Sequence, residues 1–120
     1  MGNVGRQRVG VNREAAEWLR LLGVLVRAGR VERGWRQEDL AWRIGASTNT
    51  VAAIEKGSAA VSVGLVLNAA SLVGIPFLGT DDRAGVTEAA RTAETIAALL
   101  PQRVAKRRPV EPESDDELDF

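Results

Sequence analysis

Apolar residues in the first part of the chain recur at helical spacing, and short polar or glycine-containing breaks separate them. The spacing predicts a first helix over about 13–33, with Asn12 as its N-cap and Gly34 at its end. Its expected apolar face consists of Trp18, Leu19, Leu22, Leu25 and Val26. The segment before Asn12, residues 1–11, has glycines and arginines without periodicity and is expected to be a disordered arm.

Similar patterns predict four more helices. They are expected at about 37–44, 48–56, 63–73 and from Asp81 or Asp82 to Leu100. In the helix over 63–73, we expect Leu65, Ala69 and Leu72 to face inward. In the last helix, an apolar stripe of Ala89, Ala93, Ile96 and Leu100 has two readings. It packs on the domain's own core, or it is the seam of a dimer.

The second and third predicted helices form a compact unit with a tight turn between them. Leu40 and Ile44 share one face of the first, and Val51 and Ile54 share one face of the second. Gly45 can end the first helix in the left-handed conformation, Ser47 can cap the second, and Gly57 can end it. This arrangement predicts a helix-turn-helix, whose second helix has a polar N-terminus suited to the DNA major groove.

The segment over about 20–78 resembles the Xre or lambda-repressor-like family of DNA-binding domains. The residues in register with that family's pattern are Arg30, Gly34, Gln37, Leu40, Ala41, Gly45, Ser47, Val51, Ile54, Glu55 and Gly57. The resemblance implies an all-α, lambda-repressor-like helix-turn-helix domain over 12–79, with a short element near Pro76–Gly79. An added C-terminal helix over 80–100, which can serve dimerisation, and a flexible tail over 101–120 complete the expected organisation.

The same resemblance implies a role for each polar residue of this unit. Base edges are read by Thr48, Asn49 and Ala52, and DNA phosphates are bound by Arg36, Gln37, Arg43, Ser47, Thr50 and Lys56. Arg30 and Glu55 match the family's structural ion pair between the first and third helices. Ordinary capping and solvation are the alternative roles for the polar residues. Arg36 departs from the pattern, because an arginine cannot accept the capping bond, and we expect this helix to start less firmly.

Composition narrows the classes of function. The chain has no cysteine and no histidine, so the commonest metal ligands and general base are missing. We expect no enzyme activity, no metal and no cofactor. No apolar run approaches the roughly 20 residues that span a bilayer, and the N-terminus has no apolar core of a secretory signal. We therefore expect a cytoplasmic protein.

The formal net charge of zero hides a strong asymmetry along the chain. The first 108 residues hold all 16 positive charges and ten of the negative ones, a net charge of +6, whereas the last ten residues carry −6. Such a split indicates nucleic acid and protein partners.

Together with the segment from Leu99 to Val104, the acidic ending resembles HipB-like antitoxins, which pair with HipA-like kinase toxins. There, Leu118 and Phe120 would anchor in a toxin pocket; alternatively, the tail only solubilises the protein or masks its basic surface.

The sequence therefore predicts a dimeric, sequence-specific repressor of its own operon that binds double-stranded operator DNA, and an antitoxin of a HipA-like kinase. A stand-alone or phage-type repressor is one alternative. A protein-interaction module that has kept the fold without DNA binding is the other. It is favoured by the small Ala52 and Ala53 and by the uncapped Arg36.

Overall fold

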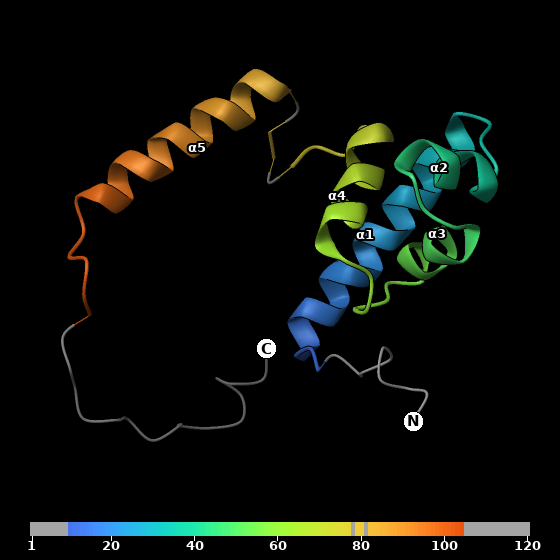
Figure 1. Ribbon diagram of the computed structural model, residues 1–120, viewed down its shortest axis with the longest axis horizontal. Helices are drawn as coiled ribbons and strands as arrows, with labels where there is room; N and C mark the ends of the chain where they lie inside the picture. Colours follow the sequence, from blue (N-terminus) through green and yellow to red (C-terminus); the bar gives the residue numbers. More distant parts are fainter. Residues whose placement is uncertain (1–9, 78, 81, 105–120) are drawn as a thin grey trace.

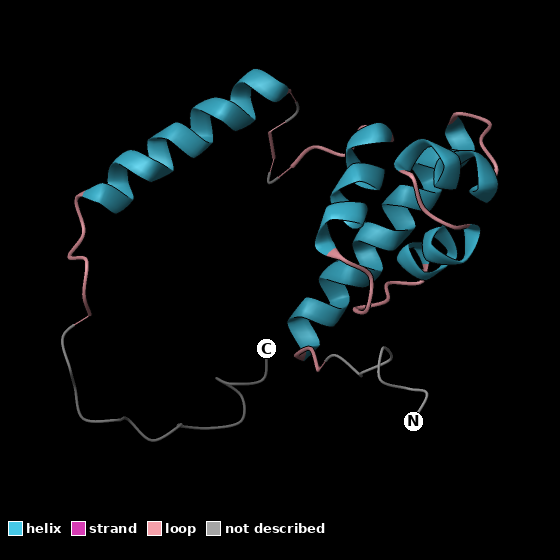
Figure 2. Cartoon of the chain, in the orientation of Figure 1, coloured by secondary structure: helices cyan, strands magenta, loops and turns pink. Residues whose placement is uncertain are grey.

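The fold is all-α, as predicted. The computed structural model describes residues 10–77, 79–80 and 82–104 (Figure 1). Its helices are α1 (Arg13–Glu32), α2 (Gln37–Ile44), α3 (Thr48–Glu55), α4 (Val63–Leu72) and α5 (Arg83–Ala98). Figure 2 shows that these described residues contain helices and loops but no strand. None of these helices is long and apolar enough to cross a membrane.

Helices α1 to α4 enclose one small aliphatic core. Helix α3 packs against both α1 and α2, and α4 closes the core by contacting the same two helices. The core consists of Val26, Leu40, Ala41, Ile44, Val51, Ile54, Val66, Ala69 and Val73. Trp35, in the loop between α1 and α2, is partly buried against this cluster. The core therefore fixes α2 and α3 relative to α1.

Side-chain caps and glycines set the helix ends close to where the sequence predicts them. The Asn12 carboxamide oxygen accepts the N–H of Ala15 at 2.7 Å, and Asp82 caps α5 by accepting the N–H of Gly85 at 2.7 Å. Gly45 ends α2 with φ of 70°, a left-handed conformation that side chains with a Cβ adopt only at a cost. As expected, the Arg36 side chain makes no capping hydrogen bond at the start of α2. The Asp39 carboxylate instead accepts the N–H of Arg36 at 2.7 Å.

The inward faces of α1 and α4 differ from the predicted ones. Trp18 and Leu25 belong to the predicted apolar face of α1 but are 64% and 41% exposed, whereas Val26 of the same face is buried as predicted, together with Gly23, Gly29 and Arg30. In α4, Leu72 is 40% exposed and Leu65 only half-buried. Ala69 faces inward as predicted, and Val66 and Ala70 lie beside it.

A glycine in α1, Gly23, permits a close contact with α3. A Cβ on Gly23 would lie 2.6 Å from the carbonyl oxygen of Ile54 and 2.7 Å from that of Glu55. The end of α3 therefore rests directly on the backbone of α1. No residue larger than glycine fits there unless two helices move apart.

Helix α5 is separate from this core. None of its residues is buried, and Figure 1 shows it extending away from the four-helix body. Packing of its apolar stripe on the domain's own core, one of the two readings from sequence, is therefore wrong for this structure. The short element expected near Pro76–Gly79 is not a helix; instead, Phe77 and Thr80 pair through two backbone hydrogen bonds of 2.9 Å.

Candidate nucleic-acid interface

Helices α2 and α3 with the turn between them form the predicted helix-turn-helix. The turn is short because Gly45 reverses the chain, and the N–H of Ala46 then donates to the carbonyl of Ala41 at 2.9 Å. Ser47 caps α3 by accepting the N–H of Thr50 at 3.1 Å. On the core side, Val51 and Ile54 are buried, and this leaves the other side of α3 open.

The N-terminus of α3 presents polar side chains and free donors to solvent. Thr48 and Asn49 are exposed, and their backbone N–H groups have no acceptor among the described residues. Thr50 is half-buried, and its hydroxyl lies 3.0 Å from that of Ser47. Free N–H groups and the positive end of the helix dipole favour an anion such as a phosphate at this end.

Asn49 also lies at the edge of a shallow hollow of about 410 Å³ beside α3. This hollow is lined by Asn49, Thr50, Ala53, Ser58, Ala60, Val61, Ser62 and Leu65. Ala53, one turn after Asn49, therefore shares its face, just as the predicted base reader Ala52 shares the face of Thr48. The (i, i+4) spacing from Asn49 was the signal that could have identified Ala53.

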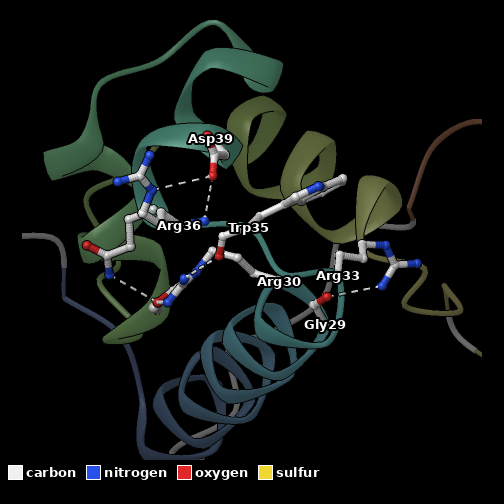
Figure 3. Close-up of polar contacts among 8 residues, drawn as sticks. Gly29, Arg30, Arg33, Trp35, Arg36 and Asp39 are labelled. Atoms are coloured by element: carbon white, nitrogen blue, oxygen red, sulfur yellow. Dashed lines mark hydrogen bonds and ion pairs between the residues drawn. The ribbon is translucent and has the colours of Figure 1, made fainter.

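A buried ion pair joins α1 to the end of the helix-turn-helix. Arg30 Nε donates to Glu55 Oε2 at 2.6 Å, and Arg30 Nη2 donates to Glu55 Oε1 at 3.0 Å. The two side chains are only 10% and 5% exposed. Arg30 Nη1 also donates to the carbonyl oxygen of Trp35 at 2.8 Å, a contact seen in Figure 3. The hydrogen bond from Arg30 to Glu55 raises the pKa of Arg30, so the guanidinium stays charged although it is buried.

Gln37 belongs to the same network. Its amide Nε2 donates to Glu55 Oε1 at 3.1 Å, and the side chain is half-buried at the first position of α2. Because a carboxamide nitrogen carries two hydrogens, one N–H of Gln37 can still reach a phosphate. Glu55 thus holds both Arg30 from α1 and Gln37 from α2. Glu55 at the end of α3 therefore also holds Gln37, the residue that is expected to bind a DNA phosphate.

The two exposed arginines near α2 have partners within the protein. Arg36 lies 3.4 Å from Glu38 and 3.9 Å from Asp39, and Figure 3 shows its guanidinium beside Asp39. Arg43 stacks over the Trp35 ring with its guanidinium carbon 4.2 Å from the ring centre. Both side chains are exposed, so a phosphate can replace these weak surface contacts without uncovering a buried charge.

The structure does not gather all of the predicted residues at one place. Ser47, Thr48, Asn49 and Thr50 lie together at the start of α3. Lys56 caps the opposite end of the same helix and is exposed there. Leu118 and Phe120, the predicted partner-binding residues, lie outside the described residues. Among the described side chains, no group of three or more histidine, cysteine or acidic residues could hold a metal ion.

Comparisons with known proteins agree with this geometry. The model of a family described as a helix-turn-helix domain matches residues 21–83, just over half of the chain. No curated protein and no solved structure matches significantly. The matched segment contains α2, the turn and α3, together with most of α1 and the whole of α4. The chain therefore belongs to the helix-turn-helix domain family, the Xre and lambda-repressor-like class of DNA-binding regulators.

Proposed function

We propose that the protein binds a specific double-stranded DNA sequence by inserting the N-terminal end of α3 into the major groove. The observation that carries this proposal is the open end of α3, where Thr48 and Asn49 are exposed and the first backbone N–H groups are free. The Asn49 amide can form two hydrogen bonds with adenine, and Thr48 can contact a thymine methyl group. Ala52 and Ala53 are too short for hydrogen bonds to bases, so we assign part of the specificity to DNA shape.

Phosphate contacts position the helix in this proposal. The remaining N–H of Gln37 and the N-terminal end of α3 bind the backbone, and Arg36 and Arg43 add fork-shaped donors when they leave their internal partners. The predicted contacts of Ser47 and Thr50 add hydroxyl groups beside the same helix end, while Lys56 reaches a separate phosphate. Binding carried by such contacts weakens steeply as the salt concentration rises.

We further propose that the protein acts as a homodimer on a palindromic operator and represses its own operon. Two α3 helices that enter successive major grooves on one side of the duplex lie about 34 Å apart. The residues of α5 support a dimer, because a 16-residue helix with an apolar stripe and no buried residue has unused apolar surface. This surface lies outside the helix-turn-helix, so it leaves the DNA-binding end of α3 free.

Within this class, we propose that the protein is an antitoxin of a HipA-like kinase. The basic stretch before the acidic ending supports this role, as does the position of Leu118 and Phe120 among carboxylates at the end of the chain. In this proposal the two apolar residues anchor in a pocket of the kinase, and the carboxylates meet its basic rim. A stand-alone or phage-type repressor would bind the same kind of DNA without this partner.

An interaction module without DNA binding is the second candidate. It is favoured by the contacts that engage Arg36 with Glu38 and Asp39, and Arg43 with Trp35. A module of this kind would keep the buried network of Arg30 and Glu55, which stabilises the fold, and would not need exposed donors on α3.

A mobility-shift assay with DNA from the protein's own promoter separates these candidates. We expect a shift that resists competitor DNA and is lost when Gln37→Ala and Asn49→Ala are combined. Asn68→Ala is the matched control, because Asn68 is exposed on α4 and its side chain has no described partner. A supershift by a co-purified kinase-like protein supports the antitoxin role. No shift, together with a stable protein partner, contradicts DNA binding.

A further inference from the structure

Helix α1 has a second apolar face that the core does not cover. Its large members remain well exposed: Trp18 at 64%, Leu21 at 57%, Val24 at 52%, Leu25 at 41% and Val31 at 57%. We call these five residues the outer α1 face. Exposed apolar patches of this kind mark interaction surfaces.

The outer α1 face is also hollowed along one edge. A shallow cavity of about 420 Å³ lies there, lined by Val24, Arg27, Ala28, Val31 and Glu55. An aliphatic side chain from a partner can occupy such a hollow, because most of the lining is apolar. The exposed apolar residues and the hollow therefore favour an elongated apolar partner about as long as the outer α1 face.

Helix α5 has complementary properties. Its apolar stripe comprises Val86, Ala89, Ala93, Ile96 and the following Leu100, with none of them buried, and Ile96 and Leu100 are 57% and 60% exposed. Most of the stability of a helix in a protein comes from packing its apolar face, and α5, with 16 residues and none of them buried, has no such packing within the described chain. At 1.5 Å per residue, the stripe from Val86 to Leu100 and the outer α1 face from Trp18 to Val31 each extend about 20 Å.

Size favours this pairing over contact between two α5 helices. The bulky side chains of the outer α1 face fit against the small Ala89 and Ala93, whereas two alanine-rich stripes would bury less apolar surface.

Helix α5 does not cover α1 of its own chain. None of its residues is buried, and Figure 1 shows it extending away from the body. Near its start, Phe77 and Thr80 form a backbone pair, and the Asp82 side chain caps the helix. Val86, in the first turn of α5, lines a hollow together with Phe77 and Ile75.

We propose that α5 of one copy packs on the outer α1 face of a second copy, and that the reciprocal contact forms at the same time. The two contacts are related by a two-fold axis, which closes the assembly as a dimer. This inference rests on the dimer of the proposed function and names the surfaces that hold it together. It leaves the N-terminus of α3 free in both copies.

Cysteine cross-linking tests the pairing directly, because the chain contains no native cysteine. Leu25 and Ala93 lie near the centres of the two surfaces, so they meet whether the helices run parallel or antiparallel. A Leu25→Cys preparation and an Ala93→Cys preparation with different tags are mixed, allowed to exchange subunits and treated with a short bis-maleimide. We expect a covalent dimer that carries both tags, and little cross-linking in either preparation alone.

Three results would overturn the pairing. The first is cross-linking in Ala93→Cys alone, which indicates an α5–α5 seam. The second is cross-linking in Leu25→Cys alone, and the third is the absence of a mixed product.

Sedimentation gives a second readout: Ala93→Glu should convert the dimer to a monomer, whereas the control Ala84→Glu, on the opposite side of α5, should not. Operator binding is measured on the same preparations. If the mixed cross-link forms but the protein does not bind the operator, only the proposed DNA binding is contradicted. If a dimer binds the operator but the mixed cross-link does not form, only this pairing is contradicted.

Discussion

The buried carboxylate of Glu55 gives the sharpest stability prediction. It accepts hydrogen bonds from Arg30 Nε, Arg30 Nη2 and Gln37 Nε2 at 2.6, 3.0 and 3.1 Å. Glu55→Ala removes all three bonds and leaves the Arg30 guanidinium, 10% exposed, with only the Trp35 carbonyl as acceptor. Removing one partner of a buried ion pair costs about 3–5 kcal/mol. For a small domain this corresponds to a fall in Tm of about 12 °C or more.

Urea unfolding followed by circular dichroism measures this loss in free energy of unfolding. Arg30→Met and the double variant Arg30→Met/Glu55→Ala complete a double-mutant cycle. We expect the double variant to lose clearly less than the sum of the single variants, because no unpaired charge is left buried. Glu17→Ala is the matched control: its ion pair with Arg20 is 63–70% exposed, so its removal should cost about 0–1 kcal/mol. A loss below about 1 kcal/mol for Glu55→Ala would refute the reasoning.

Three further predictions concern α1 and α3. Gly23→Ala should destabilise the fold by about 1–3 kcal/mol, since its Cβ would meet two carbonyl oxygens of α3; an unchanged urea midpoint contradicts this. Ser47→Ala should cost about 0.5–2 kcal/mol by removing the cap, measured by thermal unfolding, and an unchanged Tm would exclude it. Asn49→Ala should lose about 1–3 kcal/mol of discrimination at one base pair in binding to a randomised operator library. Equal weakening for all sequences would show that Asn49 does not read a base.

The helix boundaries were predictable because local residues set them. Asn12, Ser47 and Ser62 each cap a helix through a side-chain oxygen that accepts an N–H three residues later. Gly45 likewise ends α2 in the left-handed conformation, which glycine adopts more easily than any other residue. Such signals depend on a few neighbouring positions, so the order and the approximate ends of the helices follow from the sequence alone.

The inward faces of α1 and α4 were harder to predict because both helices also carry large apolar residues outside the core. Periodicity cannot select one face when Trp18, Leu22, Leu25 and Val26 all qualify, and packing against α3 and α4 then decides. In α1, the buried face is the one that contains Gly23, where α3 approaches the backbone of α1 closely.

The polar contacts of the site were only partly accessible from sequence. The Arg30–Glu55 pair was expected from the family resemblance, but the bond from Gln37 to Glu55 joins residues 18 positions apart and depends on the tertiary fold. The contact between Asp39 and Arg36 was not predicted. The Asp39 carboxylate, in the first turn of α2, accepts the backbone N–H of Arg36, so it is a bond of the helix start that does not involve the Arg36 side chain.

The division of α3 into a buried side and an open side has a consequence for how such proteins diversify. Val51, Ile54 and Glu55 carry the packing and the buried ion pair, whereas Thr48 and Asn49 touch neither. Substitutions at these two exposed positions can therefore accumulate with little effect on the free energy of unfolding. A lineage built on this scaffold can change the DNA sequence that it recognises without a compensating change in its core.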